Sequence, residues 1–256
     1  MYDISLVFPY SRPQLIRDVL KSLEGNKCSY ELVMLGEEPI DYVLPHFCTV
    51  IISHVKPAQL WEAGMRRAQG KLVCWTADDA EYSPNALDLI VSTFVEIPNP
   101  KLFVGMRTFD DGIENTYNNR LYQPNPSTPL CSTVGVVRKS FWLELGGIDR
   151  RFVGGQWEND ISMRILEAGG TFFIHKYVIC FLEHKKKHGK PMEESTMVIG
   201  YSQGRSVLEP LWLDGRNFSG KRRDAVQVFS DEGILEKSQG EKRLINEVGN
   251  IIKEWP

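Results

Sequence analysis

The feature that most constrains the fold is a regular alternation of short apolar runs with amphipathic segments over the first hundred residues. Runs at 4–8, 31–35, 49–53 and 72–76 are apolar or β-branched, as in buried strands. Segments 13–23, 57–68 and 84–96 between them have the spacing of helices. Such alternation predicts an α/β fold with a mostly parallel central sheet flanked by helices. Ligands of such sheets bind at the carboxyl ends of the strands.

The pattern changes after residue 110. Segment 110–129 is rich in Asn, Pro, Gly and Asp, which predicts an irregular excursion. Further strands are expected at 134–137, 171–174 and 178–182, and helices at 140–145 and 160–168. The signal weakens after about Lys190 and recovers helical character only at 241–252. We therefore expect one domain over 1–190 and a C-terminal extension, 191–256, packed on or near it.

Composition excludes several classes of protein. The net charge of −3 gives no electrostatic case for nucleic acid as a partner. The five cysteines are widely spaced and form no C-x-x-C pair, so neither a disulfide framework nor a cysteine zinc site is expected. A reducing compartment follows from this cysteine usage. The sequence has no basic, apolar start typical of a signal peptide and no apolar run of about 18 residues that would span a membrane. We expect a cytoplasmic protein with no transmembrane segment.

The first candidate site is the acidic pair Asp78-Asp79, which directly follows the apolar run 72–76. Both carboxylates should lie at the carboxyl end of that strand. Adjacent carboxylates there suit a hard divalent cation, which takes oxygen ligands and bridges phosphate oxygens. A solvated acidic turn before the helix at 84–96 is the plainer alternative.

A second acidic group opens the helix expected at 160–168. Asp160 stands where a helix cap or first-turn residue belongs, and capping is the favoured reading of this residue. Glu158 lies just before it, after the glycine pair 154–155. A carboxylate in that loop can act as a general base if a substrate hydroxyl comes within hydrogen-bond reach, and capping is an equally good reading.

Three other positions fall near the predicted sheet edge. His184 ends a strand-like run and is either a metal ligand beside Asp79 or a surface histidine in a basic loop. Glu37 follows the second strand, where an acid can accept hydrogen bonds from a base or ribose, or simply form a polar turn. Pro9-Tyr10 ends the first strand, so that Tyr10 is placed to stack on a base or to belong to the core.

Several of these residues belong to motifs that occur in a known order. The motifs are SLVFPY at 5–10, GMRRAQGK at 64–71, TADD at 76–79 followed by Pro84, LGGIDRRF at 145–152 and ENDISMR at 158–164. In order and spacing they cover about residues 4–185. The chain resembles the family 2 glycosyltransferases, which have the GT-A fold. The glycine-glycine motif at 145–152 is the most specific match.

The resemblance implies an inverting, metal-dependent glycosyltransferase of the hexosyl type. Its donor is a nucleotide-diphosphate sugar, with uridine favoured, and its acceptor a hydroxyl of a glycan or another molecule. By the same resemblance Asp79 and His184 hold Mn or Mg, Asp78 contacts the donor ribose or orients the metal, and Glu37 meets the nucleotide base. Glu158 aligns with the acid that deprotonates the acceptor hydroxyl.

The sequence departs from the family pattern at two places. Thr76 stands where the family has an acid, and Asn159 interrupts its acidic pair, which leaves the base open between Glu158 and Asp160. Because of these departures, a non-catalytic nucleotide- or glycan-binding module of the same fold stays an alternative hypothesis. A sugar-nucleotide pyrophosphorylase is disfavoured because the loop after the first strand, 9–13, contains no glycine.

Overall fold

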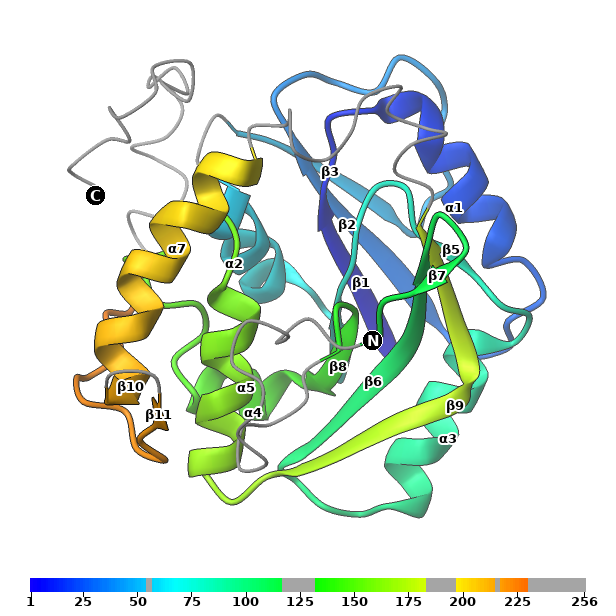
Figure 1. Cartoon of the computed structure of the whole chain (residues 1–256). Helices are drawn as coiled ribbons and strands as arrows, with labels where there is room; N and C mark the ends of the chain where they lie inside the picture. Colours follow the sequence, from blue (N-terminus) through cyan, green and yellow to red (C-terminus); the bar gives the residue numbers. More distant parts are fainter. Residues whose placement is uncertain (54–56, 117–131, 183–196, 215–216, 230–256) are drawn as a thin grey trace.

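The computed structural model describes residues 1–53, 57–116, 132–182, 197–214 and 217–229 (Figure 1). The main sheet contains β1 (Ile4–Pro9), β2 (Tyr30–Gly36), β3 (Cys48–Ile52), β4 (Leu72–Trp75), β5 (Glu81–Tyr82), β6 (Leu102–Asp110), β7 (Ile113–Glu114), β8 (Gly135–Arg138) and β9 (Thr171–Leu182). The helices are η1 (Pro13–Leu15), α1 (Ile16–Ser22), α2 (Pro57–Arg67), α3 (Ala86–Glu96), α4 (Lys139–Glu144), α5 (Trp157–Glu167) and α7 (Met197–Trp212). A small ladder joins β10 (Leu213–Asp214) to β11 (Asn217–Phe218).

The strand order in the sheet is β3-β2-β1-β4-β8-β6-β9-β5, with β7 beside β6. Strands β1 to β4 are parallel, and β6 and β9 run in the same direction, whereas β8, β5 and β7 run against their neighbours. The sheet is therefore mixed, and because β1, β2, β3, β4, β6 and β9 share one direction, the expectation of a mostly parallel sheet flanked by helices is confirmed. Strand β8 is antiparallel because of where it enters the sheet. The chain leaves β6 and β7 at the carboxyl edge, where the N–H of Thr133 donates a hydrogen bond to the carbonyl of Thr116. The chain then re-enters the sheet from that edge.

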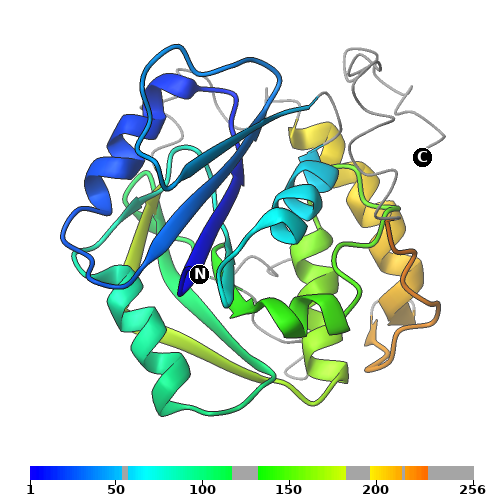
Figure 2. The ribbon, with the colours of Figure 1, turned by 180° about the vertical axis from the view of Figure 1, so that it is seen from behind.

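Helices cover both faces of the sheet. Helices α1 and α3 lie on one face, and α2, α4 and α5 lie on the other, with α7 outside them (Figures 1 and 2). Side chains of β1, β2 and β4 alternate between two cores, because successive residues of a strand point to opposite faces. Leu6 of β1, for example, packs in the core with α1 and α3, while its neighbour Val7 packs with α2 and α5.

Besides the two-residue strands β5, β7, β10 and β11, two longer elements were not expected. Strand β6 lies inside the sheet, between β8 and β9. Its sequence directly follows a proline- and asparagine-containing turn and precedes the irregular segment, so no strand was predicted there. Helix α7 was missed because its sequence is interrupted by Gly204 and Pro210. The strands expected at 171–174 and 178–182 form one strand, β9. Its pairing with β6 shifts register between Met106 and Arg107, and this irregularity absorbs the break in the pattern.

The chain after α7 belongs to the same core as α2 and α5. Leu208, Leu211 and Trp212 of α7 are buried in that core together with Phe229. Beyond β11, residues 219–229, here called the C-terminal segment, return along α5. In the part of the chain that the structure describes, no helix has both the length and the apolar character to cross a bilayer. The division of the chain at residue 190 stays a prediction.

Helix α2 sits close to the sheet because of Gly64. A methyl group at this position would meet Val7 and lie 2.6 Å from Cδ1 of Leu35. Replacing Gly64→Ala should lower the free energy of unfolding by about 1–3 kcal/mol, since overpacking outweighs the gain in helix propensity. Arg67→Ala, on the exposed face of the same helix, should change it by no more than about 0.5 kcal/mol. Urea denaturation of both variants measures the difference, and equal stability would contradict the close approach.

Candidate functional site

The candidate site lies at the carboxyl edge of the parallel strands. In the sheet register Pro9 pairs with Leu35, and Val7 pairs with Trp75, so the ends of β1, β2 and β4 are neighbours. The loops that follow these three strands therefore meet along one edge. They carry most of the residues singled out from the sequence, including Tyr10, Glu37 and Asp78.

The acidic pair is buried and holds a guanidinium group. Asp79 has no exposed surface, and Asp78 is 4% exposed. Oδ2 of Asp78 accepts hydrogen bonds from the backbone N–H groups of Ser11 at 2.9 Å and Arg12 at 3.1 Å. The Arg12 guanidinium pairs with Asp78 Oδ1, and its Nη1 lies 3.5 Å from Asp79 Oδ2. Arg12 thus joins the loop after β1 to the loop after β4.

Electrostatics at Asp78 are a balance of two effects. Burial raises the pKa of Asp78 above its ordinary value, while the Arg12 cation opposes that shift. Two carboxylates that already hold one cation have the right chemistry for a divalent metal, which prefers oxygen ligands. A metal bound here would share the pair with Arg12. Among the described residues, no group of three or more His, Cys, Asp or Glu side chains is arranged to hold a metal ion.

The other residues predicted on this edge have separate environments. Pro9 ends β1, and Tyr10 is buried with its ring against the backbone of Gly36, where an added Cβ would lie 2.6 Å from the ring atom Cε2. The hydroxyl of Tyr10 donates to the carbonyl of Glu38. Glu37 is half-buried in the loop after β2. His184 and the lysines after it lie outside the described residues.

Thr76, which stands in place of a family acid, is also buried. Its hydroxyl hydrogen-bonds the hydroxyl of Tyr82 on β5. Its carbonyl accepts a hydrogen bond from Trp61 Nε1 at 3.3 Å. Thr76 therefore secures the turn that presents Asp78 and Asp79, and it offers no charge to a ligand.

Aromatic packing connects this edge with helix α5. Trp75 ends β4, directly before the acidic turn, and its ring centroid lies 5.8 Å from that of Trp157, the first residue of α5. Trp61 of α2 and Trp142 of α4 also contact Trp157, at 5.4 and 6.3 Å. Trp75 and Trp157 are almost fully buried. This four-tryptophan cluster fixes the start of α5 next to the carboxyl end of β4.

Glu158 is the second residue of α5. The residue before the helix, Gln156, has φ 72°, a left-handed conformation that turns the chain abruptly into the helix. The carboxyl oxygen Oε2 of Glu158 is buried, and burial raises the pKa of Glu158 to about 7. A carboxyl with that pKa exchanges its proton near neutral pH, which is what a general base requires.

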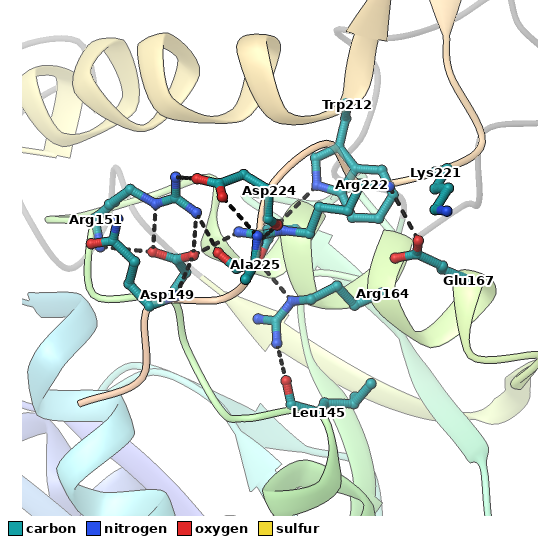
Figure 3. Close-up of polar contacts among 12 residues, drawn as sticks. Leu145, Asp149, Arg151, Arg164, Glu167, Trp212, Lys221, Arg222, Asp224 and Ala225 are labelled. Carbon is teal, nitrogen blue, oxygen red and sulfur yellow. Dashed lines mark hydrogen bonds and ion pairs between the residues drawn. The ribbon is translucent and has the colours of Figure 1, made fainter. Parts of the chain in front are cut away.

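Asp160 has a different environment, although it lies in the same helical turn. Its Oδ2 accepts from Arg164 Nε at 2.8 Å, and its Oδ1 accepts from Trp212 Nε1 at 2.8 Å and Arg222 Nε at 3.1 Å. The side chain is fully buried. Figure 3 shows these partners, Arg164 of α5, Trp212 of α7 and Arg222 of the C-terminal segment, close to one another. Both oxygens of Asp160 are used in joining these elements.

The glycine-glycine motif at 145–152 also has a structural role. Gly146 and Gly147 have φ of 82° and 69°, and a Cβ on Gly147 would meet the carboxyl group of Glu62. Glu62 of α2 accepts from the N–H of Ile148 at 2.8 Å. The carbonyl of Gly147 accepts from Arg164 Nη2 at 2.7 Å. The motif therefore ties α2 and α5 together, and its glycines allow that close approach.

Comparison with solved structures yields clear fold neighbours. A structure of GalNAc-T7 with UDP, GalNAc and Mn²⁺ has a TM-score of 0.59 and 13% identity over 84% of this chain and 49% of that chain. S. aureus TarS 1-349 gives 0.57 and 10% identity over 81% of this chain and 73% of that one. The complex of TarS 1-349 with UDP-GlcNAc gives 0.51 and 11% over 70% and 58%. The chain has the GT-A fold.

Sequence comparison adds nothing to this assignment. No protein-family model matches the chain, and no curated protein matches its sequence. The chain spans about half the length of the GalNAc-T7 chain. At these identities the likeness establishes the GT-A fold alone, and membership of family 2 stays a prediction.

Sequence reasoning missed three kinds of residue at this site. Arg12 follows a strand end, and only the folded sheet shows that it faces the acidic pair. The tryptophans were readable as core residues, but their contact across α2, α4, β4 and α5 depends on tertiary structure. Arg222 lies in a part of the chain without a recognisable pattern. The one sequence feature that pointed to Arg222 was its charge, in a segment with little pattern of helix or strand.

Asp160 and Glu158 should differ in their effect on stability. Asp160→Ala leaves the buried Arg164 and Arg222 without their shared carboxylate and should lower the free energy of unfolding by about 3–5 kcal/mol. Glu158→Gln should leave it unchanged or raise it at pH 8. The pKa of Glu158 is higher in the folded protein than in the unfolded chain, so its stabilising effect is lost as pH rises through about 7. Urea denaturation at pH 8 measures both values, and equal losses would contradict these assignments.

Proposed function

We propose that this protein is a glycosyltransferase that moves a sugar from a nucleotide-diphosphate donor to a hydroxyl acceptor. The observation that carries the proposal is the placement of two acidic groups on a GT-A fold. The Asp78-Asp79 pair follows β4, and Glu158 opens α5, with the packing of Trp75 on Trp157 holding the two segments together. The carboxyl groups of these residues differ in environment, which suits them to different tasks.

The donor is proposed to be a UDP-sugar. Among the fold neighbours, GalNAc-T7 was solved with UDP, GalNAc and Mn²⁺, and TarS with UDP-GlcNAc. In this chain Pro9, Tyr10, Glu37 and Asp78 lie in the loops at the ends of β1, β2 and β4, where nucleotides bind to such sheets. Because the ring of Tyr10 is packed against Gly36, we assign it to shaping this edge of the sheet. Glu37 is the residue proposed to meet the base.

A divalent metal, Mn or Mg, is proposed to bind at Asp79. Asp78 is already engaged by Ser11 and Arg12, so we assign it to orienting the loop and the donor ribose. His184 is the second proposed metal ligand, on the basis of the family resemblance of the sequence. Bound there, a metal would neutralise charge on the diphosphate as it leaves. Arg12 would add a fixed positive charge on the same side.

Glu158 is proposed to act as the general base. The oxygen of the acceptor hydroxyl attacks the anomeric carbon of the sugar and forms the new glycosidic bond. The bond from that carbon to the β-phosphate oxygen breaks, and the nucleotide diphosphate leaves with the electron pair. The hydroxyl proton passes to the carboxylate of Glu158. A single displacement of this kind inverts the anomeric configuration.

Asp160 was the second candidate for this base. Its two oxygens accept hydrogen bonds from Arg164, Trp212 and Arg222, so proton abstraction would break buried pairs that join three elements. We therefore propose a structural role for Asp160 and assign catalysis to Glu158. The hexosyl type of the transfer and membership of family 2 belong to the same proposal.

Calorimetric titration tests the donor site. UDP, GDP and TDP are each titrated with and without Mn²⁺ into the wild type and Asp79→Ala. We expect UDP to bind only with the metal, and the variant to lose this binding and turnover, because its first metal ligand is gone. Glu144→Ala, on the exposed side of α4, serves as the control and should bind as the wild type does.

Other outcomes have definite meanings. Binding of GDP or TDP in place of UDP would change the donor class. Binding that persists in Asp79→Ala would remove this residue from the site. Nucleotide binding without turnover for any acceptor would indicate a non-catalytic module of the same fold. Absence of binding to all three would reject the transferase.

The pH dependence of turnover tests the base. Since burial raises the pKa of Glu158 to about 7 and the ionised form is the base, kcat should fall below about pH 7 and level off above it. Glu158→Gln should lower kcat by about 10²–10⁴-fold and keep donor binding. Glu144→Gln should keep the wild-type profile. A wild-type kcat in Glu158→Gln would remove this residue from the chemistry.

A further inference from the structure

We propose that Arg222, from the C-terminal segment, positions Glu158 for catalysis by bridging two buried carboxylates beneath the first turn of α5. The inference rests on the proposed function, and it assigns a role in that function to a part of the chain outside the motifs of the GT-A resemblance. Arg222 acts through the helix, so it is a positioning residue and makes no contact with substrate.

The side chain of Arg222 is inserted between Asp149 and Asp160. Its Nη2 lies 2.6 Å from Asp149 Oδ2, and its Nε lies 3.1 Å from Asp160 Oδ1. Both carboxylates are fully buried, and the side chain of Arg222 is 5% exposed. Figure 3 shows Arg222 reaching from the C-terminal segment toward Asp149, close to Trp212 and Arg164. One cation therefore links two segments that lie on either side of Glu158 in the sequence.

Glu158 is held between these two attachments. Asp149 begins the loop that leads to α5, and Asp160 lies two residues beyond Glu158 in the first turn of the helix. The loop is secured further, since Asp149 also accepts from Arg151 Nε at 3.0 Å and from the N–H of Gln227 at 3.1 Å. A helical turn cannot tilt without moving the side chains within it. Fixing Asp160 therefore fixes the backbone from which the Glu158 side chain extends.

Helix α7 packs against the outer side of the same loop. Gln203 donates to the carbonyl of Arg151 at 2.9 Å and accepts from the N–H of Val153 at 3.2 Å. Gly204 lies against the backbone of Gly155, and an added Cβ would sit 2.9 Å from Gln156 Cβ. Gly154 and Gly155, the glycine pair before α5, are buried here. The loop before Glu158 is thus enclosed by the C-terminal part of the chain.

The shape of the guanidinium explains why an arginine stands here. Its nitrogens form a rigid planar fork that can serve two carboxylates at once, whereas a lysine offers a single charged point. Arg222→Lys should keep one of the two pairs, and Arg222→Gln should keep neither charge interaction. The two variants therefore grade the loss of the bridge.

Steady-state kinetics with a UDP-sugar separates positioning from binding. Since a displacement of about 1 Å can cost about a hundredfold in rate, kcat should fall by about that factor in Arg222→Gln. Arg222→Lys should recover part of the loss. The donor KM should stay at the wild-type value in both, because the Asp78-Asp79 edge is held by other contacts. A wild-type kcat in folded Arg222→Gln, or a raised donor KM with unchanged kcat, would overturn the proposal.

Hydrogen exchange provides a readout that does not depend on turnover. In Arg222→Lys the amides of 149–161 should exchange faster, while those of β1, β2 and β4 keep wild-type protection. Uniformly faster exchange over the whole chain, or unchanged exchange at 149–161, would overturn the positioning role. If the wild type turns over no donor, the proposed function fails, and this measurement still decides whether Arg222 holds the start of α5.

A second pair of variants reaches the loop without touching a charge. Gly204→Ala places a methyl group against Gly155 and Gln156, so it should increase exchange at 149–161 and lower kcat with an unchanged donor KM. Ser206→Ala, at an exposed position of the same helix, should leave both at wild-type values. Wild-type kcat and exchange in Gly204→Ala would contradict the enclosure of the loop by α7.

Discussion

The contact between Trp75 and Trp157 is the interaction on which the arrangement of the site depends. Trp75 ends a strand of the sheet, and Trp157 begins a helix about eighty residues later in the chain. Large aromatic side chains bury much apolar surface and lock into a few relative orientations. Glu158 directly follows Trp157, and Asp78 lies three residues after Trp75. The packing of the two rings therefore sets the relation between the acidic turn and Glu158.

Two arginines stabilise the two parts of the site, the acidic turn and the start of α5. Arg12 fixes the acidic turn from the loop after β1, and Arg222 fixes the helix from the C-terminal segment. Both arginines pair with carboxylates that are almost fully buried. A buried charge is costly unless it is paired, so each arginine requires its carboxylate partner to be in place, and each carboxylate requires its arginine. The site is therefore assembled from segments that lie far apart in the sequence and are joined by these pairs.

Local pattern predicted much of this fold and part of this site. The period of apolar residues located β1, β2, β3 and β4, and the position of Asp78 and Asp79 at the end of β4 followed from it. The sequence could not show that β8 enters the sheet from the carboxyl edge and so runs against β4 and β6. The direction of a strand depends on the edge at which the preceding chain arrives. The sequence also left the assignment of the base open between Glu158 and Asp160. Only their tertiary partners distinguish them: Trp212 and Arg222 come from more than fifty residues away.

The direction of the sheet also separates the loops of this protein into two groups with different freedom to vary. The loops at the carboxyl edge carry Arg12, Glu37 and Asp78, whereas the turn at Gly25 precedes β2 at the opposite edge. The space around Gly25 is open, and so is the space around Gly169 before β9. Both glycines have positive φ, 89° and 74°, so an attachment belongs on a residue beside them. Tags, labels or surface attachments placed on these amino-edge turns would be separated from the chemistry by the length of the sheet. The protein could thus be immobilised or labelled through one edge while the other faces its ligands.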